Sequence, residues 1–179
     1  MIPAPQPKNE FLRLHALRSL NVLDTPKDYR FEMITQYTAK MLEAPICLIA
    51  LIDNDRQWFK SAYGLDTQET PRNISFCGHS ICDVASDKAN ERIVEVHDTL
   101  LDERYFDNPI VIGEPFIRSY IAYILQSDTG MNIGTLCVDN TIPKEYSHSQ
   151  KQLLILFGTM VENLLHGRNH LYGIDRKLD

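Results

Sequence analysis

The chain has 179 residues, 44% of them hydrophobic, and its 18 basic and 24 acidic side chains give a formal net charge of −6. This length and composition indicate one soluble domain, and the acidic balance argues against a nucleic-acid partner, because such binders usually carry a basic stripe for phosphates. The longest apolar run, Ile46–Ile52, is far shorter than the roughly 20 residues of a membrane-spanning helix. With no basic start or apolar stretch at the N-terminus, we expect a cytoplasmic protein with no signal peptide and no membrane partner.

Helices are predicted near both ends of the chain. After an extended, proline-rich lead-in over residues 1–9, apolar side chains recur at helical spacing from Glu10 to Asn21. Thr25 and Pro26 predict the start of a second helix, whose buried stripe is expected to consist of Phe31, Ile34, Thr38, Met41 and Leu42. Ser147 and Gln150 form a capping box that starts a long final helix.

The middle of the chain has the composition of strands. Continuous apolar runs rich in β-branched residues are typical of strands covered on both faces, and the turn residues between them predict antiparallel hairpins. The expected strands are Ile46–Ile52, Gln57–Leu65, Arg92–Val96, Ser119–Gln126 and Asn132–Asp139. Strands between terminal helices indicate an α+β domain, with a central antiparallel sheet of about five to six strands and terminal helices packed on one face.

Two further segments are expected to cover the sheet. Ser75 is predicted to cap a short helix that reaches Ala85, after a polar loop over Asp66–Asn73. Asp98–Gly113 is a long acidic loop, and the seventeen residues from Glu91 to Asp107 carry a net charge of −4. Such a cover would disfavour multiply charged anions as ligands unless Arg104 and Arg118 both turn inward. We place one domain at residues 10–168 and a tail at 169–179.

Several motifs in order along the chain resemble the GAF sensory-domain family. They are Asp53–Ser61, Glu69–Arg72, Ile74–His79, Asp102–Tyr105 and Gly134–Val138. The likeness is to bacterial GAF modules found upstream of diguanylate cyclase or histidine kinase domains, and it spans about residues 11–165. It implies a GAF-like (PAS-like) fold with a ligand pocket between one sheet face and the helix and loops that cover it. It also implies a sensory, regulatory role in signal transduction through small-molecule binding, dimerisation or both.

The resemblance suggests which residues line that pocket but not which ligand enters it, because one fold hosts unrelated sites. The candidates are Trp58, Phe76, His79, Cys82, Asp98, Arg104, Arg118 and Tyr120. The two arginines could hold an anion or pair with the carboxylates around them, and the aromatic residues could stack on a planar ligand or belong to the core. No cofactor is identified.

The family usually has an Ala-Gly-x-Pro-Leu type run where this chain has Ile121–Leu125. Tyr123 and Ile124 within that run leave a third alternative, an adaptor whose pocket is filled by its own side chains.

A thiol redox function is the alternative from a different class. His79, Cys82 and Asp83 share one helical face, where an imidazole could activate the thiol. Free methionine-(R)-sulfoxide reductase, which has a GAF fold, contains a similar sequence motif. Its catalytic cysteine comes after the strand that corresponds to the one before His97 in this chain, whereas Cys82 comes before that strand. We therefore expect a non-enzymatic domain. A metal site that adds Cys77 lacks a fourth ligand at recognisable spacing, and we expect reduced thiols.

The final helix also predicts a partner. Leu153, Phe157, Met160 and Leu164 have the spacing of a helical seam, and a second row beside them widens the apolar arc. We expect a homodimer through the terminal helices, or a separate signalling protein as partner. Since only the tail follows this helix, we expect a stand-alone module.

Overall fold

The computed structural model describes residues 1–83 and 88–175, with residues 168–175 described by their backbone alone. Six strands form one antiparallel sheet in the order β3-β2-β1-β6-β5-β4. They are β1 (Ile46–Ile52), β2 (Arg56–Tyr63), β3 (Glu69–Pro71), β4 (Ile93–Val96), β5 (Ser119–Gln126) and β6 (Asn132–Asn140). The α+β prediction is confirmed.

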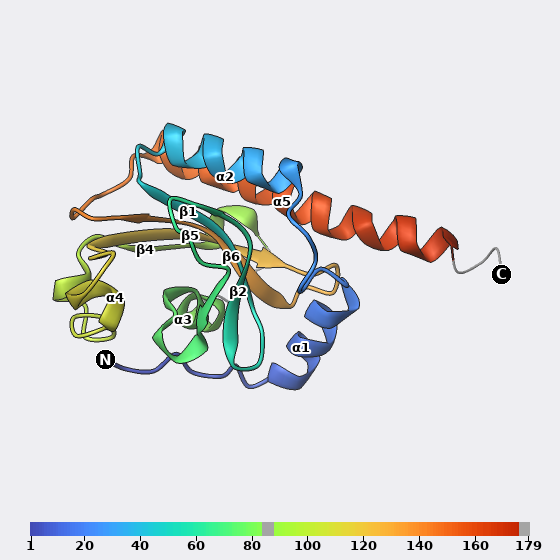
Figure 1. Cartoon of the computed structure of the whole chain (residues 1–179), viewed down its shortest axis with the longest axis horizontal. Helices are drawn as coiled ribbons and strands as arrows, with labels where there is room; N and C mark the ends of the chain where they lie inside the picture. Colours follow the sequence, from blue (N-terminus) through green and yellow to red (C-terminus); the bar gives the residue numbers. More distant parts are fainter. Residues whose placement is uncertain (84–87, 176–179) are drawn as a thin grey trace.

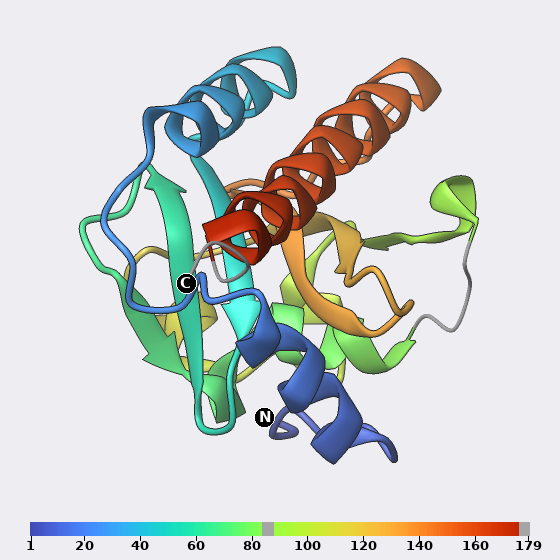
Figure 2. The same ribbon diagram turned by 90° about the vertical axis from the view of Figure 1, so that its right-hand side faces the viewer.

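Helices cover both faces of this sheet. They are α1 (Glu10–Ser19), α2 (Tyr29–Met41), α3 (Phe76–Asp83), α4 (Pro109–Ile112) and α5 (His148–Asp175). Helices α2 and α5 lie side by side on one face, whereas α3 and α4 lie on the other (Figure 1). Helix α1 lies across one end of the sheet (Figure 2), where the Arg13 guanidinium donates a hydrogen bond to the Ile52 carbonyl at 2.6 Å. Within the described residues, no helix is long and apolar enough to span a membrane.

The sheet therefore separates two apolar cores. Every residue of β1 and β5 is buried, as expected for strands covered on both faces. Because side chains alternate along a strand, Ile121 and Tyr123 of β5 join the core beneath α2 and α5, while Tyr120 and Ala122 join the core beneath α3. Strand β5 thus contributes side chains to both cores.

Helix α5 is held by its cap and by a buried ion pair. Gln150 N donates to Ser147 Oγ at 3.3 Å, and the Ser147 amide donates to Gln150 Oε1 at 3.0 Å, which confirms the capping box. On α5, Glu162 Oε1 accepts hydrogen bonds from Arg92 Nη1 at 2.6 Å and from the Gln126 amide at 2.7 Å. These bonds tie α5 to the edge formed by β4 and β5.

The start of α2 differs from the prediction. Asp28, rather than Thr25, caps the helix by accepting a hydrogen bond from the Arg30 amide. The buried Lys60 ammonium donates to Thr25 Oγ1 at 2.9 Å and to the Pro26 carbonyl at 2.7 Å. Thr25 and Pro26 therefore bind Lys60 and lie before the first residue of the helix. Met41, expected in the buried stripe, is half-exposed.

The segments read as loops contain short regular structure. The polar loop before Ser75 includes β3, and the acidic loop includes α4, which starts where the Asn108 side chain accepts a hydrogen bond from the Ile110 amide. Val84 and Ala85, expected in the third helix, lie outside the described residues. Helix α5 continues to Asp175, past residue 168, where the sequence placed the start of a tail.

Candidate functional site

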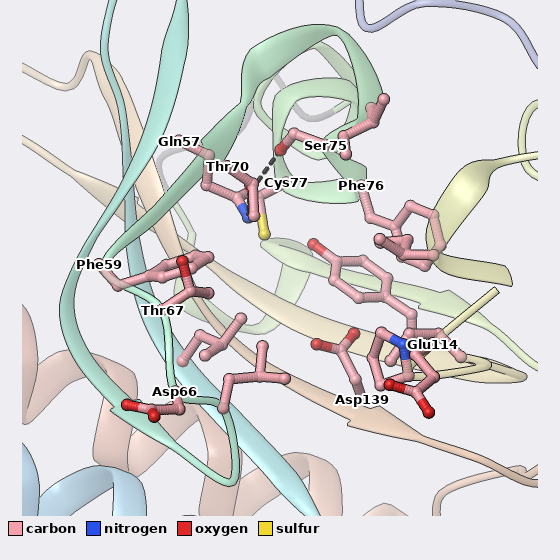
Figure 3. A pocket seen from close by; sticks show the side chains of 17 residues that line it. Gln57, Phe59, Asp66, Thr67, Thr70, Ser75, Phe76, Cys77, Glu114 and Asp139 are labelled. Atoms are coloured by element: carbon pink, nitrogen blue, oxygen red, sulfur yellow. Dashed lines mark hydrogen bonds between the residues drawn. The ribbon is translucent and has the colours of Figure 1, made fainter.

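A cavity of about 360 Å³ lies between the sheet and α3, on the face opposite α2 and α5 (Figure 3). Strands β1, β2, β5 and β6 form its floor, and the segments around residues 65–70 and 110–117 close its sides. The apolar lining consists of Leu48, Phe59, Leu65, Ile74, Phe76, Ile110, Pro115 and Ile117. The polar and acidic lining consists of Gln57, Asp66, Thr67, Thr70, Ser75, Cys77, Glu114, Tyr120 and Asp139.

Most polar groups at the inner wall are bonded to one another. Ser75 caps α3, because its Oγ accepts a hydrogen bond from the Gly78 amide at 2.8 Å, and its hydroxyl donates to Gln57 Oε1. Gln57 Nε2 donates in turn to Thr70 Oγ1 at 3.3 Å. The predicted Ser75 cap is confirmed, and the side chains of Ser75, Gln57 and Thr70 have hydrogen-bond partners within the protein.

Asp139, on β6, is different. Its residue is only 7% exposed, and Figure 3 shows its carboxylate pointing into the cavity. Among the described residues, no hydrogen bond or ion pair reaches this carboxylate. Burial away from water raises its pKa to about 7, because the charged form loses hydration without gaining a partner.

The cavity has an acidic rim as well. Asp66 and Glu114 line it and are exposed. No lysine, arginine or histidine of the described chain lines it. The charged side chains of the lining are therefore all carboxylates.

Two of the eight sequence-predicted pocket residues line this cavity, namely Phe76 and Tyr120. Their aromatic rings meet edge to face with centroids 5.5 Å apart, and the Tyr120 hydroxyl bonds to Ser80 Oγ at 2.9 Å. Trp58 lies in the opposite core beneath α2, because its neighbour Phe59 is the residue of β2 that faces the cavity.

His79 and Cys82 sit on the outer side of α3, under the N-terminal segment. The His79 Nε2 is 2.9 Å from the Ile2 carbonyl, and the Cys82 thiol donates to the Pro5 carbonyl with Sγ and O 3.6 Å apart. The lead-in over residues 1–9 thus packs along α3, as Figure 1 shows. These two residues lie outside the cavity.

The remaining three predicted residues, Asp98, Arg104 and Arg118, form surface ion pairs. Arg118 binds Asp98 at 2.9 Å, while Arg104 binds Asp102 at 2.7 Å and Asp83 at 2.8 Å. Hydrogen bonds from these arginines lower the pKa of Asp98 and of Asp102. Of the two roles considered for the arginines, the structure shows the pairing with carboxylates, which fastens the acidic loop. That loop contributes only Ile110 to the cavity lining.

Sequence comparison then decides the family. The sequence model of the GAF domain matches residues 29–165. The chain belongs to the GAF domain family. A cyclic di-GMP phosphodiesterase of Pseudomonas aeruginosa is 38% identical over 144 residues, which are 80% of this chain and 23% of that protein. The GAF chain thus spans less than a quarter of the length of this relative.

Solved structures share the GAF fold. The GAF domain of an Acinetobacter phosphoenolpyruvate-protein phosphotransferase superposes with a TM-score of 0.60 at 17% identity, covering 90% of this chain and 97% of the other. The free methionine-R-sulfoxide reductase of Neisseria meningitidis gives a TM-score of 0.60 at 16% identity, covering 96% and 98%. At such identities the likeness concerns the fold alone.

The surroundings of the cysteines in this GAF domain differ from those that the redox hypothesis requires. Burial raises the pKa of the Cys82 thiol and lowers the pKa of His79, so both groups favour their neutral forms. The thiols of Cys77 and Cys137 are in contact, with their Sγ atoms 3.6 Å apart, and both are buried. Within the part of the chain that the structure describes, no three His, Cys, Asp or Glu side chains are grouped to hold a metal ion.

Sequence reasoning missed Asp139, Gln57 and Glu114. A carboxylate directly after the apolar run that ends at Val138 reads as the end of a strand, and it was assigned to that boundary. The signal that could have found it is its place inside the paired region, since Asp139 pairs with Tyr120 of β5. Asp139 lies next to the last residue of β6, and a buried carboxyl without a partner there either stays protonated or binds a ligand.

Proposed function

We propose that this GAF domain is a non-enzymatic signalling module that binds a small molecule in the cavity beneath α3 and transmits binding to α5. The observation that carries the proposal is the cavity itself, which lies between the sheet and α3 and combines eight apolar with nine polar or acidic lining residues. Its volume lies in the range of about 300–1,000 Å³ that is usual for small-molecule sites. The hydrogen-bonded wall around Ser75 favours a binding role over a catalytic one.

The route from cavity to helix runs through β5. Tyr120 faces the cavity, and Tyr123, three residues later, packs against α5 on the other face. Gly158 of α5 lies directly against Tyr123, because a Cβ at this position would overlap the Tyr123 ring. A ligand that shifts Tyr120 moves the strand on which α5 rests.

We propose further that α2 and α5 form a dimer interface with a second copy of this chain. Four side chains of α2 follow one another at intervals of four residues and are between 47% and 71% exposed; they are Tyr29, Met33, Tyr37 and Met41. Beside them, α5 presents Met160, which is also exposed, and Phe157 and Leu164, which line the same apolar groove. Two adjacent helices with such a face pair with an identical face as a four-helix bundle.

Ligand binding is tested by a thermal-shift screen of small cationic, neutral and anionic fragments. Leu48→Phe fills the cavity from its floor, and Leu101→Phe makes the same substitution at a residue that is 85% exposed. A fragment present at about 100 times its Kd stabilises the folded state by about 2.7 kcal/mol, so melting temperature rises by about 5–10 °C in a domain of this size. We expect this shift in the wild type and Leu101→Phe and not in Leu48→Phe. Equal shifts in all three proteins would place binding elsewhere.

The dimer is tested by sedimentation equilibrium. Tyr37→Lys places a charge in the centre of the apolar stripe, and Leu101→Lys is the matched control on the far side of the molecule. We expect a wild-type dimer, a monomeric Tyr37→Lys variant and a dimeric control. A wild type that stays monomeric at high concentration contradicts the homodimer and leaves a separate signalling protein as the partner of this face.

A further inference from the structure

We propose that the ligand of this cavity is a small molecule with an apolar body and a protonated amine that binds the carboxylate of Asp139. The inference rests on the proposed ligand-sensing function and names the chemical class that the cavity selects. It starts from one fact: Asp139 is buried, points into the cavity and, within the described residues, meets no donor of its own chain. An ion buried without a partner is costly, and a ligand that supplies the missing charge recovers that cost on binding.

Among the described residues, no lysine, arginine or histidine lines the cavity beside Asp139. The ammonium of Lys144, which lies over the Tyr146 ring, donates to the Leu42 and Glu43 carbonyls instead. The other titratable groups near Asp139 are phenols, thiols or a further carboxylate. They are Cys47 of β1, Tyr120 of β5, Cys137 of β6, Tyr146 before α5 and Glu114 on the cavity rim. Arg104 and Arg118, which the sequence suggested as pocket residues, form surface ion pairs outside the cavity.

Charge also decides against anionic ligands. A phosphate or carboxylate in this cavity would face Asp139 with no cation to offset the repulsion, and it would pass Asp66 and Glu114 at the rim. Like charges in a low-dielectric site repel strongly. A cyclic dinucleotide, with two phosphates, is therefore the wrong class for this cavity.

The rest of the lining sets the body of the ligand. Leu48, Phe59, Phe76 and Ile117 provide apolar and aromatic walls, and Gln57 is already bonded to Ser75 and Thr70. The volume of about 360 Å³ equals that of roughly a dozen water molecules at about 30 Å³ each. A single aromatic ring or a short branched chain with one amine fits this space.

Binding through Asp139 has a pH signature. The pKa of the empty site, about 7, means that the carboxylate is roughly ten times more populated at pH 8 than at pH 6, while an aliphatic amine stays protonated at both. If the amine binds the ionised carboxylate, its affinity falls about tenfold from pH 8 to pH 6. A ligand that does not contact Asp139 shows no such change.

The experiment measures binding of three probes of similar shape by isothermal titration calorimetry: 2-phenylethylamine, 2-phenylethanol and 3-phenylpropionate. The proteins are the wild type, Asp139→Asn and the matched control Asp128→Asn, which makes the same substitution at an exposed residue outside the cavity. We expect the amine to bind wild type and Asp128→Asn at least tenfold more tightly than the carboxylate, with the pH dependence above. In Asp139→Asn we expect the preference and the pH dependence to vanish while 2-phenylethanol still binds, which shows that the cavity is intact.

Two results would overturn the inference. If the wild type binds 2-phenylethanol or 3-phenylpropionate as tightly as the amine, or if Asp139→Asn keeps the preference for the amine, the amine assignment is wrong and the sensing proposal stands. If no probe binds the wild type at millimolar concentration, both the inference and the proposed ligand-sensing function are contradicted.

Discussion

Replacing Asp139 by asparagine is expected to stabilise the empty domain, by an amount that grows with pH. The substitution keeps the shape of the side chain and removes its charge. In the unfolded chain an aspartate has a pKa of about 3.9, whereas burial raises the pKa of Asp139 to about 7 in the folded protein. The folded state therefore binds the proton more tightly, and the wild type loses stability as pH rises from about 4 to about 7.

The size of the effect follows from the two pKa values. At about 1.36 kcal/mol per pKa unit, the ionisable carboxyl costs the folded state about 1.5 kcal/mol at pH 5 and about 4 kcal/mol at pH 8. Asparagine has no such cost at either pH. Any constant difference in packing or hydrogen bonding between the two side chains cancels when the two pH values are compared. The stability gain of Asp139→Asn should thus be about 2.5 kcal/mol larger at pH 8 than at pH 5.

Urea unfolding of the wild type and the variant at both pH values measures this difference. In thermal melts the same difference corresponds to about 5–10 °C for a domain of this size. Other groups also differ in pKa between the folded and unfolded states: although burial alone would raise it, hydrogen bonds from Arg13 and Arg72 lower the pKa of Glu10 to about 2, which is below this pH range. Such groups are common to both proteins, so they drop out of the comparison.

Asp128→Asn serves as the control, because it makes the same substitution at an exposed carboxylate outside the cavity. Its stability relative to the wild type should change little between pH 5 and pH 8. If Asp139→Asn gives the same gain at both pH values, the carboxylate of Asp139 is hydrated or paired in the folded protein. An amine ligand would then have no unpaired buried carboxylate to bind.

Three further predictions concern the other elements of the site and its coupling. Gly158→Ala should destabilise the domain by about 1–3 kcal/mol in urea unfolding, because its methyl group overlaps the Tyr123 ring and outweighs the better helix propensity of alanine; a stabilised variant would contradict that contact. Glu162→Ala should cost about 3–5 kcal/mol, since it leaves the Arg92 guanidinium buried without its carboxylate, and a loss below about 1 kcal/mol would mean that this pair is hydrated. Alkylation of Cys82 should show a midpoint above the ordinary thiol pKa of about 8.5, because burial raises its pKa; fast reaction at neutral pH would instead support the redox alternative.

Much of the fold could be predicted from the sequence because its strands carry their own signal. Ile46–Ile52 is apolar throughout, and this pattern arises only where both faces of a strand are covered, as they are here. Short elements lack such a signal. Strand β3 has three residues, too few to show a period. Thr25 and Pro26 are not the start of α2, because both accept hydrogen bonds from Lys60 on β2.

The cavity was harder to predict, because its lining depends on which of two consecutive strand residues faces the cavity and which faces the opposite core. Trp58 and Phe59 are equally suited to a pocket by composition, and only strand register decides that Phe59 lines it. The arginines were similarly ambiguous until Asp98 and Asp102 were seen to bind them. Asp139 was overlooked because a lone carboxylate at a strand end looks like a solvated boundary, and its burial depends on α3 and the following loops.

The same alternation that hid the site also explains how it can signal. Asp139 and Val138 are neighbours on β6, but Asp139 faces the cavity and Val138 belongs to the core beneath α2 and α5. A ligand that draws Asp139 toward its amine therefore pulls on a backbone whose other side supports the proposed dimer interface. In the signalling route that we propose, small shifts of the sheet would be passed to α5 instead of being absorbed, because interiors are close-packed and Gly158 lies directly against the Tyr123 ring of the neighbouring strand.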